Sequence, residues 1–252
     1  MMRKDNPQLP NTELCEKLLS NENLKAAFIK VKKNGGAAGI DKMKVCELDT
    51  YLDSNIKDIK SKIISRKYKF KAVKRVEIPK DNGKTRMLGI PTVLDRFVQQ
   101  LVVQVITPLF EPTFSAFSYG YRPKRSAEDA VRQAQIYIAE GYKYVVDMDL
   151  SKFFDTVNHD KLMGLVDETL EDKDIRRLIF SSLKSGVMDN GFKGETNVGT
   201  PQGGVISPIL SNIYLTPFDK EMEKRGVKFI RYADDILWKS LHSMSSAYLQ
   251  YA

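Results

Sequence analysis

Two adjacent aspartates, Asp234 and Asp235, stand between two short, mainly apolar runs at residues 229–232 and 236–238. Runs of this length that are rich in aromatic and β-branched residues are typical of β-strands, so the pattern predicts two strands joined by a tight turn. Such turns favour Asn-Gly or Asp-Gly, and Ala-Asp-Asp is not a preferred sequence. Because departures from local rules tend to mark functional sites, the sequence predicts a hairpin whose turn carries a functional pair of carboxylates.

A second acidic pair, Asp147 and Asp149, lies in the apolar run at residues 144–150. The side-chain period of two places both carboxylates on one face of the predicted strand, together with Val145. Two acids on one face repel each other, so such a pair is tolerated at an exposed edge or is useful where a divalent cation gathers carboxylates. An isolated Asp-x-Asp pair more often has the first explanation. Hard oxygen ligands from separate strands, however, suit two Mg²⁺ ions, which hold the attacking and leaving oxygens in phosphoryl transfer.

The charge balance favours polyanionic partners. The chain has 252 residues, of which 40 are Lys or Arg and 32 are Asp or Glu, so its formal net charge is +8 at pH 7. Nucleic acid is the first candidate partner for such a balance, which says nothing about the fold. Hydrophobic residues make up 42% and charged residues 29%, and this composition indicates a globular chain rather than a disordered polyelectrolyte.

Neither a metal-binding cysteine motif nor a membrane segment is predicted. Cys15 and Cys46 are far apart and have no His at ligand spacing, so free thiols in a reducing cytoplasm are the better interpretation. The N-terminus lacks the apolar core of a signal peptide, and the longest apolar stretch, residues 97–106, is interrupted by glutamines. We therefore expect a cytoplasmic protein without a membrane span.

The N-terminal part shows helical periodicity followed by a hairpin. Apolar residues recur at helical intervals in residues 12–33 and 48–63, and the second stretch also carries a basic face. Residues 73–90 alternate apolar and polar around an Asp-Asn-Gly turn. This alternation predicts a β-hairpin with Lys80 and Arg86 near its tip.

Two capping boxes predict the starts of two further helices. Thr92 with Asp95 would begin an apolar helix that ends at Pro108. The Ser-Ala-Glu-Asp sequence at 126–129 would begin a second helix that ends at Gly141. The apolar face of the second helix would contain Ala127, Ala130, Val131, Ala134 and Ile138.

Three motifs carry a resemblance to a known family. Residues 149–155 (Asp-Leu-Ser-Lys-Phe-Phe-Asp) and 232–235 (Tyr-Ala-Asp-Asp) are similar to two catalytic boxes of reverse transcriptases, and residues 199–212 are similar to the motif beside their incoming nucleotide. Further segments narrow the resemblance to group II intron-encoded reverse transcriptases with maturase function; they are residues 36–41, 80–91 and 117–123. The resemblance covers about residues 30–238.

The resemblance implies an α+β fold, with the fingers and palm of a right-hand polymerase. The antiparallel palm sheet would pack on helices, and a helical extension would precede it. The predicted ranges are 1–70 for the N-terminal extension and start of the fingers, 71–92 for the fingers hairpin, 93–160 for the first palm part with a fingers insertion, 161–198 for the second fingers part, and 199–252 for the second palm part. Longer members of the family continue into a helical thumb, so a chain truncated before the thumb is expected.

The same resemblance assigns roles to individual residues. Asp149, Asp234 and Asp235 would be catalytic, and together with Leu150 they would form the site of two Mg²⁺ ions. Asp147 is the alternative to Asp149, and the family's spacing to the second Phe of the first box favours Asp149. The residues expected at the nucleotide are Lys80, Arg86, Phe154, Gln202 and Gly203. The residues expected at RNA are Gly39, Arg122, Lys124 and Arg125.

Phe154 would lie beneath the sugar and exclude a 2′-hydroxyl group, although without the resemblance both Phe153 and Phe154 would be interpreted as core residues. The function implied is an RNA-directed DNA polymerase of a group II intron. It would add dNTPs to a DNA primer on an intron RNA template and assist splicing by binding RNA. Two alternatives stay open, namely a truncated RNA-binding module without catalysis and a reverse transcriptase of another bacterial lineage. Self-association is also left open.

Overall fold

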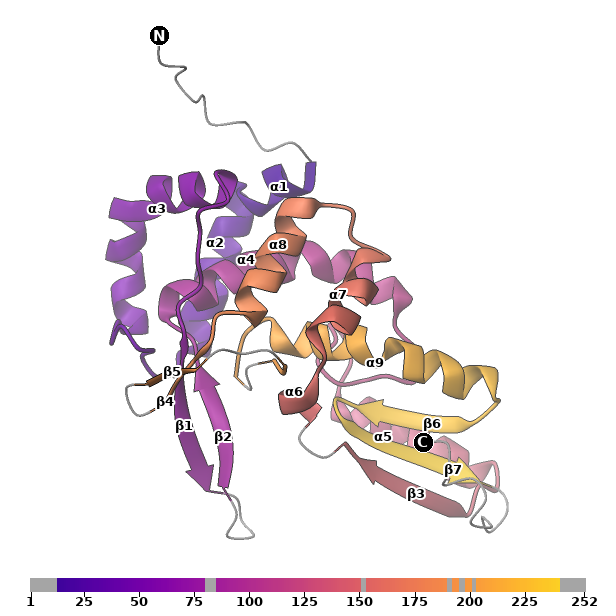
Figure 1. Cartoon of the computed structure of the whole chain (residues 1–252). Coiled ribbons are helices and arrows are strands. Elements are labelled where there is room, and N and C mark those ends of the chain that lie inside the picture. Colours follow the sequence, from indigo (N-terminus) through magenta and orange to yellow (C-terminus); the bar gives the residue numbers. More distant parts are fainter. Residues whose placement is uncertain are drawn as a thin grey trace. The chain divides into compact units, whose positions relative to one another are not determined.

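The computed structural model of the chain describes residues 13–79, 85–150, 153–189, 192–194, 198–200 and 203–240. The chain divides into two compact units, of which unit 1 comprises Met1–Leu109 and Phe154–Ser207, and unit 2 comprises Phe110–Phe153 and Pro208–Ala252. Each unit contains one β-sheet together with several helices (Figure 1). The predicted α+β class is therefore confirmed. The five functional ranges expected from the sequence stay a prediction.

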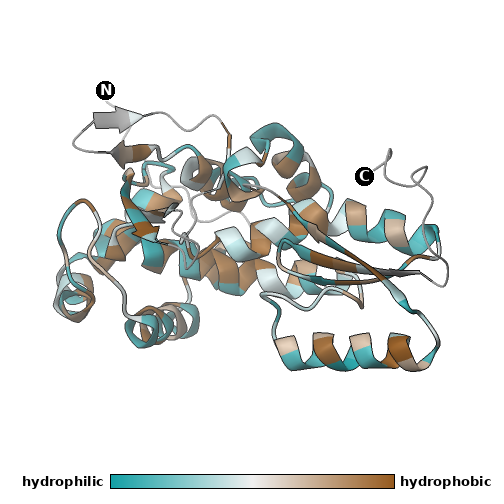
Figure 2. Ribbon diagram, turned by 90° about the horizontal axis from the view of Figure 1, so that it is seen from below, coloured by the Kyte–Doolittle hydropathy of each residue, from teal (hydrophilic) through white to brown (hydrophobic). Residues whose placement is uncertain are grey.

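Unit 1 contains a four-stranded sheet with the strand order β2-β1-β4-β5. Its strands are β1 (Val73–Pro79), β2 (Thr85–Ile90), β4 (Val187–Asp189) and β5 (Phe192–Gly194). Its helices are α1 (Glu13–Leu18), α2 (Asn21–Asn34), the 3₁₀ helix η1 (Val45–Glu47), α3 (Leu48–Ile64), α7 (His159–Asp167) and α8 (Lys173–Leu183). Hydrophobic and hydrophilic residues alternate along the helices in Figure 2, as they do in amphipathic helices.

The predicted hairpin at 73–90 is confirmed. Strands β1 and β2 pair antiparallel from Lys74 opposite Ile90 to Pro79 opposite Thr85, while β4 runs parallel to β1. The residues of the turn, Lys80 among them, lie outside the described part of the chain, and so does the side chain of Arg86.

The long helix α4 (Val93–Phe110) forms much of the core of unit 1. Its start matches the predicted capping box, because the hydroxyl oxygen of Thr92 accepts a hydrogen bond from the backbone N–H of Asp95 at 3.1 Å. Its end differs from the prediction, because Pro108 lies inside the last turn and the helix continues to Phe110. A proline there removes one intrahelical hydrogen bond without ending the helix at once. Residues Val93–Thr113 are long and apolar enough to cross a membrane, and 67% of the window is buried inside the protein, as in a core helix.

Unit 2 contains a three-stranded antiparallel sheet with the order β3-β7-β6. Its strands are β3 (Tyr144–Asp149), β6 (Lys228–Tyr232) and β7 (Asp235–Ser240). The helices of this part are η2 (Glu111–Thr113), α5 (Ala127–Ala139), α6 (Phe153–Thr156), which continues into unit 1, and α9 (Ser207–Lys224), which begins at the last residue of unit 1. The sheet confirms the predicted hairpin around the adjacent aspartates.

Helix α5 packs on the sheet through a small core that contains Ala130, Tyr137 and Ile230. Its N-terminal capping box is confirmed. The predicted apolar face is wrong at three positions, because Ala127 is exposed and Val131 and Ile138 are 57% and 61% exposed. The bulky ring of Tyr137 takes the inward position instead, which rotates the buried face away from these side chains.

Candidate active site

The carboxylates of unit 2 come together because β3 pairs with β7. Asp149, the last residue of β3, is the register partner of Asp235, the first residue of β7. Residues directly opposite in an antiparallel pair project to the same face of the sheet. Asp234 precedes Asp235 in the turn between β6 and β7, so three carboxylates gather at one end of the sheet. Asp147 and Asp149 are both exposed, as expected for two acids on one strand face.

The turn between β6 and β7 has an unusual backbone. Tyr232 pairs with Asp235, which leaves Ala233 and Asp234 as the two turn residues. Ala233 has a φ of 61°, in the left-handed region that glycine usually occupies, and its exposed fraction is 5%. Gly120 packs against it so closely that a Cβ atom at Gly120 would lie 2.3 Å from the backbone nitrogen of Ala233. Only glycine therefore fits at position 120.

The carboxylates repel one another electrostatically. Burial, followed by the charges of Asp234, Asp149 and Asp147, raises the pKa of Asp235. A divalent cation would relieve this repulsion, and carboxylate oxygens are the ligands that Mg²⁺ prefers. The donor set therefore fits a hard cation. In the arrangement of the described residues, no three His, Cys, Asp or Glu side chains are close enough to hold a metal ion as they stand.

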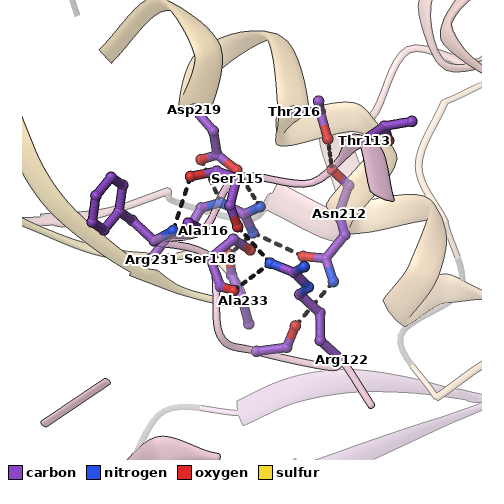
Figure 3. Close-up of polar contacts among 12 residues, drawn as sticks. Thr113, Ser115, Ala116, Ser118, Arg122, Asn212, Thr216, Asp219, Arg231 and Ala233 are labelled. Carbon is purple, nitrogen blue, oxygen red and sulfur yellow. Dashed lines mark hydrogen bonds and ion pairs between the residues drawn. The ribbon is translucent and has the colours of Figure 1, made fainter. Parts of the chain in front are cut away.

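A buried polar network supports this turn (Figure 3). Arg231 of β6 donates to both carboxylate oxygens of Asp219 on α9, at 2.8 Å from Nε and 2.6 Å from Nη2. Its Nη1 donates to Oδ1 of Asn212, also on α9, and to the carbonyl oxygen of Ala233, both at 2.9 Å. The amide nitrogen of Asn212 donates to the carbonyl oxygen of Gly120 at 2.9 Å. Arg231, Asp219 and Asn212 are all completely buried.

Sequence analysis did not single out these three residues. One available signal was Arg231 itself, a charge within a short and otherwise apolar run. The other was the spacing of seven residues between Asn212 and Asp219, which places both on one face of α9. Nothing in the sequence pairs that helix face with the strand, because the contact depends on how α9 and β6 pack against each other.

The residues expected at RNA have different surroundings. The guanidinium of Arg122 is buried, and it donates to the carbonyl oxygens of Ser115 and Ser118 and to the carboxylate of Glu111. It is thus engaged inside unit 2, and its contact with RNA stays a prediction. Lys124 is exposed and has a φ of 60°.

Two further residues expected at RNA also contact the protein itself. The guanidinium of Arg125 lies over the ring of Tyr119, at 5.2 Å from the ring centroid. Gly39 lies in unit 1, where a Cβ atom would be 2.7 Å from the Cα atom of Thr92. Gly39 therefore allows the backbone to pass closely over the start of α4.

In unit 1 the structure joins segments of the predicted nucleotide site. The backbone N–H of Thr200 donates to the carbonyl oxygen of Phe154 at 2.6 Å. Gly203, with a φ of 101°, lies against β2, and a Cβ atom there would be 2.8 Å from the carbonyl oxygen of Gly89. Phe154 itself is 8% exposed. Gln202 lies outside the described residues.

Leu150, within the first catalytic box, and His159, just after it, have local structural roles. The carbonyl oxygen of Leu150 accepts a hydrogen bond from the backbone N–H of Phe153 at 3.0 Å, which starts the short helix α6. His159, the first residue of α7, is buried, and its Nε2 lies 2.6 Å from the carbonyl oxygen of Gly199. This contact ties the first residue of the nucleotide motif to the start of α7.

The chain belongs to the reverse transcriptase family, because residues 78–246 match the family described as "Reverse transcriptase (RNA-dependent DNA polymerase)". Protein YkfC of Escherichia coli (strain K12) is 36% identical over 220 residues, which are 85% of this chain and 58% of the relative. Group II intron-encoded protein LtrA of Lactococcus lactis subsp. cremoris is 34% identical over 199 residues, which are 77% of this chain and 33% of the relative. The predicted resemblance to group II intron reverse transcriptases and maturases is thereby confirmed.

A solved structure supports the fold. The chain resembles a chain of a partial Cas6-RT-Cas1–Cas2 complex with a TM-score of 0.59 and 22% identity, over 93% of this chain and 39% of that one. At this identity the similarity concerns the fold alone. Members of the reverse transcriptase family generally use a divalent metal ion, and the carboxylates at the end of the β3–β7 pair are oxygen donors of the kind that suits such an ion.

Proposed function

We propose that the chain is the fingers and palm part of a group II intron RNA-directed DNA polymerase. The observation that carries this proposal is the register of β3 and β7, which places Asp149 opposite Asp235 and beside the turn that holds Asp234. The match to the reverse transcriptase family supports the same assignment. Because the chain spans about half of YkfC and a third of LtrA, the activity of the whole protein belongs to the proposal.

The residues of the site would divide the work as follows. Asp149, Asp234 and Asp235 would hold two Mg²⁺ ions, which supply charge stabilisation to the attacking and leaving oxygens in phosphoryl transfer. Carboxylates held on a paired strand and hairpin keep their positions without reorganising during the reaction. Lys80 and Arg86 would bind the triphosphate as cations, and Gly203 would let the backbone approach the nucleotide.

Intron RNA is the proposed template and splicing partner. The net charge of +8 favours a polyanion. Among the residues expected at RNA, the exposed Lys124 is the one that extends into solvent from a left-handed backbone position. LtrA, a group II intron-encoded protein, supports an intron as the source of the RNA.

The second candidate is an RNA-binding module that does not polymerise. It shares the positive charge with the first candidate but has no need for three carboxylates at one end of the sheet, because acidic residues weaken binding to phosphates. Burial, followed by the charges of the nearby aspartates, raises the pKa of Asp235, and this gathering of carboxylates favours the polymerase. Binding of RNA alone is compatible with both candidates.

Primer extension separates these functions. The assay uses the longest gene product that carries these 252 residues, a DNA primer annealed to RNA, and dNTPs with or without Mg²⁺. We expect DNA products that depend on the divalent ion, and tighter binding of intron RNA than of an unrelated transcript. RNA binding without any extension would contradict the polymerase and support the binding module. Extension on unrelated RNA, without a preference for intron RNA, would support the polymerase activity and contradict the role in splicing.

A further inference from the structure

The contact between Arg231 and Ala233 acts on one particular peptide group. The carbonyl oxygen that accepts the hydrogen bond belongs to the peptide bond between Ala233 and Asp234. Because a peptide bond is planar, fixing this oxygen also fixes the backbone nitrogen of Asp234. The guanidinium of Arg231 therefore sets the direction in which the chain enters the residue that carries the carboxylate.

The same turn is held from a second side. Asn212 contacts Arg231 through its oxygen and the carbonyl oxygen of Gly120 through its nitrogen. Gly120 in turn packs directly against the backbone of Ala233. One side chain of α9 thus connects the guanidinium with the segment that covers the turn, and the left-handed conformation of Ala233 lies between them.

The buried ion pair makes a set of directed hydrogen bonds that stability of the fold alone does not require. A buried ion pair loses hydration on both partners, and apolar residues of similar volume often replace it without loss of stability. The ion pair of Arg231 and Asp219 is completely buried. The planar guanidinium can bind both carboxylate oxygens and still direct Nη1 to two other acceptors, which an ammonium group on a flexible stem cannot do.

We propose that Arg231 is a positioning residue, which holds the Ala233–Asp234 peptide and thereby orients the Asp234 carboxylate. Asp219 and Asn212 hold the guanidinium in place from α9. Arg231 itself touches neither substrate nor metal in this account. The use of the oriented carboxylate in catalysis rests on the proposed function, whereas the restraint on the turn does not.

The test compares Arg231→Lys with the parent protein. Lysine keeps a positive charge for Asp219 but lacks the fork that reaches Ala233. We expect the variant to fold, as measured by circular dichroism, and its amides at residues 232–236 to exchange hydrogen about tenfold faster or more. The Mg²⁺ concentration for half-maximal primer extension should also rise, by about tenfold, because residues behind a metal ligand typically change metal affinity by this amount.

The matched control is Arg225→Lys. Arg225 forms an exposed ion pair with Glu221, at 2.6 Å and away from the turn, so we expect the parent's exchange rates and Mg²⁺ requirement in this variant. If Arg231→Lys does not fold, the double variant Arg231→Met/Asp219→Leu is measured instead. This double variant removes both members of the ion pair, so no unpaired charge stays buried. We expect the same faster exchange in the double variant.

Two results would overturn the positioning role. One is a folded variant whose turn exchanges like the parent's, and the other is unfolding of both variants, which would make the network a requirement of the fold only. A parent protein that extends no primer would refute the proposed function instead. In that case hydrogen exchange at the turn would still decide the role of Arg231.

Discussion

Asp149 and Asp235 lie directly opposite each other in the antiparallel pair of β3 and β7. One is the last residue of its strand and the other is the first, so the pairing register brings together segments that are far apart in the sequence. A slip of this register by one residue would turn one carboxylate to the opposite face of the sheet. The site therefore depends on the alignment of a strand with a hairpin.

The first prediction concerns the two neighbouring rings of the first catalytic box. Phe153 and Phe154 are 6% and 8% exposed, so burial does not distinguish them. The ring of Phe153 packs against Tyr214, with 6.0 Å between centroids. We expect Phe153→Ala to lower the free energy of unfolding by about 3 kcal/mol through the loss of core packing. Denaturant unfolding measures this change.

Phe154→Ala should act on sugar selection instead. If this ring excludes the 2′-hydroxyl group by overlap, shortening it should raise incorporation of ribonucleotides relative to deoxynucleotides. Primer extension with each nucleotide type measures the ratio, and Phe153→Ala is the matched control. If Phe154→Ala keeps the sugar preference of the parent protein, Phe154 does not exclude the 2′-hydroxyl group. The choice between Asp147 and Asp149 would then be open again.

The second prediction concerns RNA binding. If phosphate contacts dominate, as the net charge of +8 suggests, affinity for structured RNA should fall steeply with salt. Between 50 and 200 mM salt the fall should be roughly a thousandfold if about six phosphates are neutralised. A filter-binding titration at several salt concentrations measures the slope, and a flat response would argue against nucleic acid as a partner.

The third prediction uses the two cysteines. Cys46 is exposed, whereas Cys15 is buried. Burial, assisted by the charges of Asp172, Asp174 and Glu16, raises the pKa of Cys15 from its ordinary value of 9.0 to about 11. Since the thiolate is the reactive form, an alkylating reagent at pH 8 should label one thiol per folded chain, and Cys46→Ser should abolish the fast labelling. Mass spectrometry counts the labels, and equal reaction of both thiols would contradict the burial of Cys15.

The raised pKa of Cys15 also has a consequence for stability. The unfolded chain loses the thiol proton near pH 9, whereas the folded chain keeps it until about pH 11. The contribution of this group is therefore fully present below pH 9 and is lost as the pH rises through 11. In Cys15→Ala, the unfolding free energy should fall less over this range than in the parent protein.

Local rules predicted much of the fold. The hairpins, both capping boxes and the shared face of Asp147 and Asp149 follow from periodicity and turn chemistry over a few residues. The predicted end of α4 at Pro108 was wrong because a proline in a last turn interrupts only one hydrogen bond. The exposure of Val131 was missed because packing, rather than the sequence of α5, selects which of several apolar sides is buried.

The candidate site was only partly predictable for a similar reason. The acidic residues were visible as violations of strand and turn preferences. Their support was only hinted at, because Arg231 is a charge within an apolar run but its partner Asp219 is recognised only when β6 and α9 are placed together. Contacts between side chains of a helix and a strand depend on how the two elements pack, so local sequence patterns do not report them.

Substitution of the predicted metal-binding carboxylates tests the central claim most directly. In the longest gene product that carries the chain, primer extension is compared for Asp149→Asn, Asp234→Asn and the matched control Asp147→Asn, which lies on the same strand face. We expect the first two variants to fold and to lose at least about a hundredfold in rate, because metal ions supply several kcal/mol of transition-state stabilisation. We expect Asp147→Asn to stay within a fewfold of the parent. Normal extension by folded Asp149→Asn or Asp234→Asn protein would contradict the account.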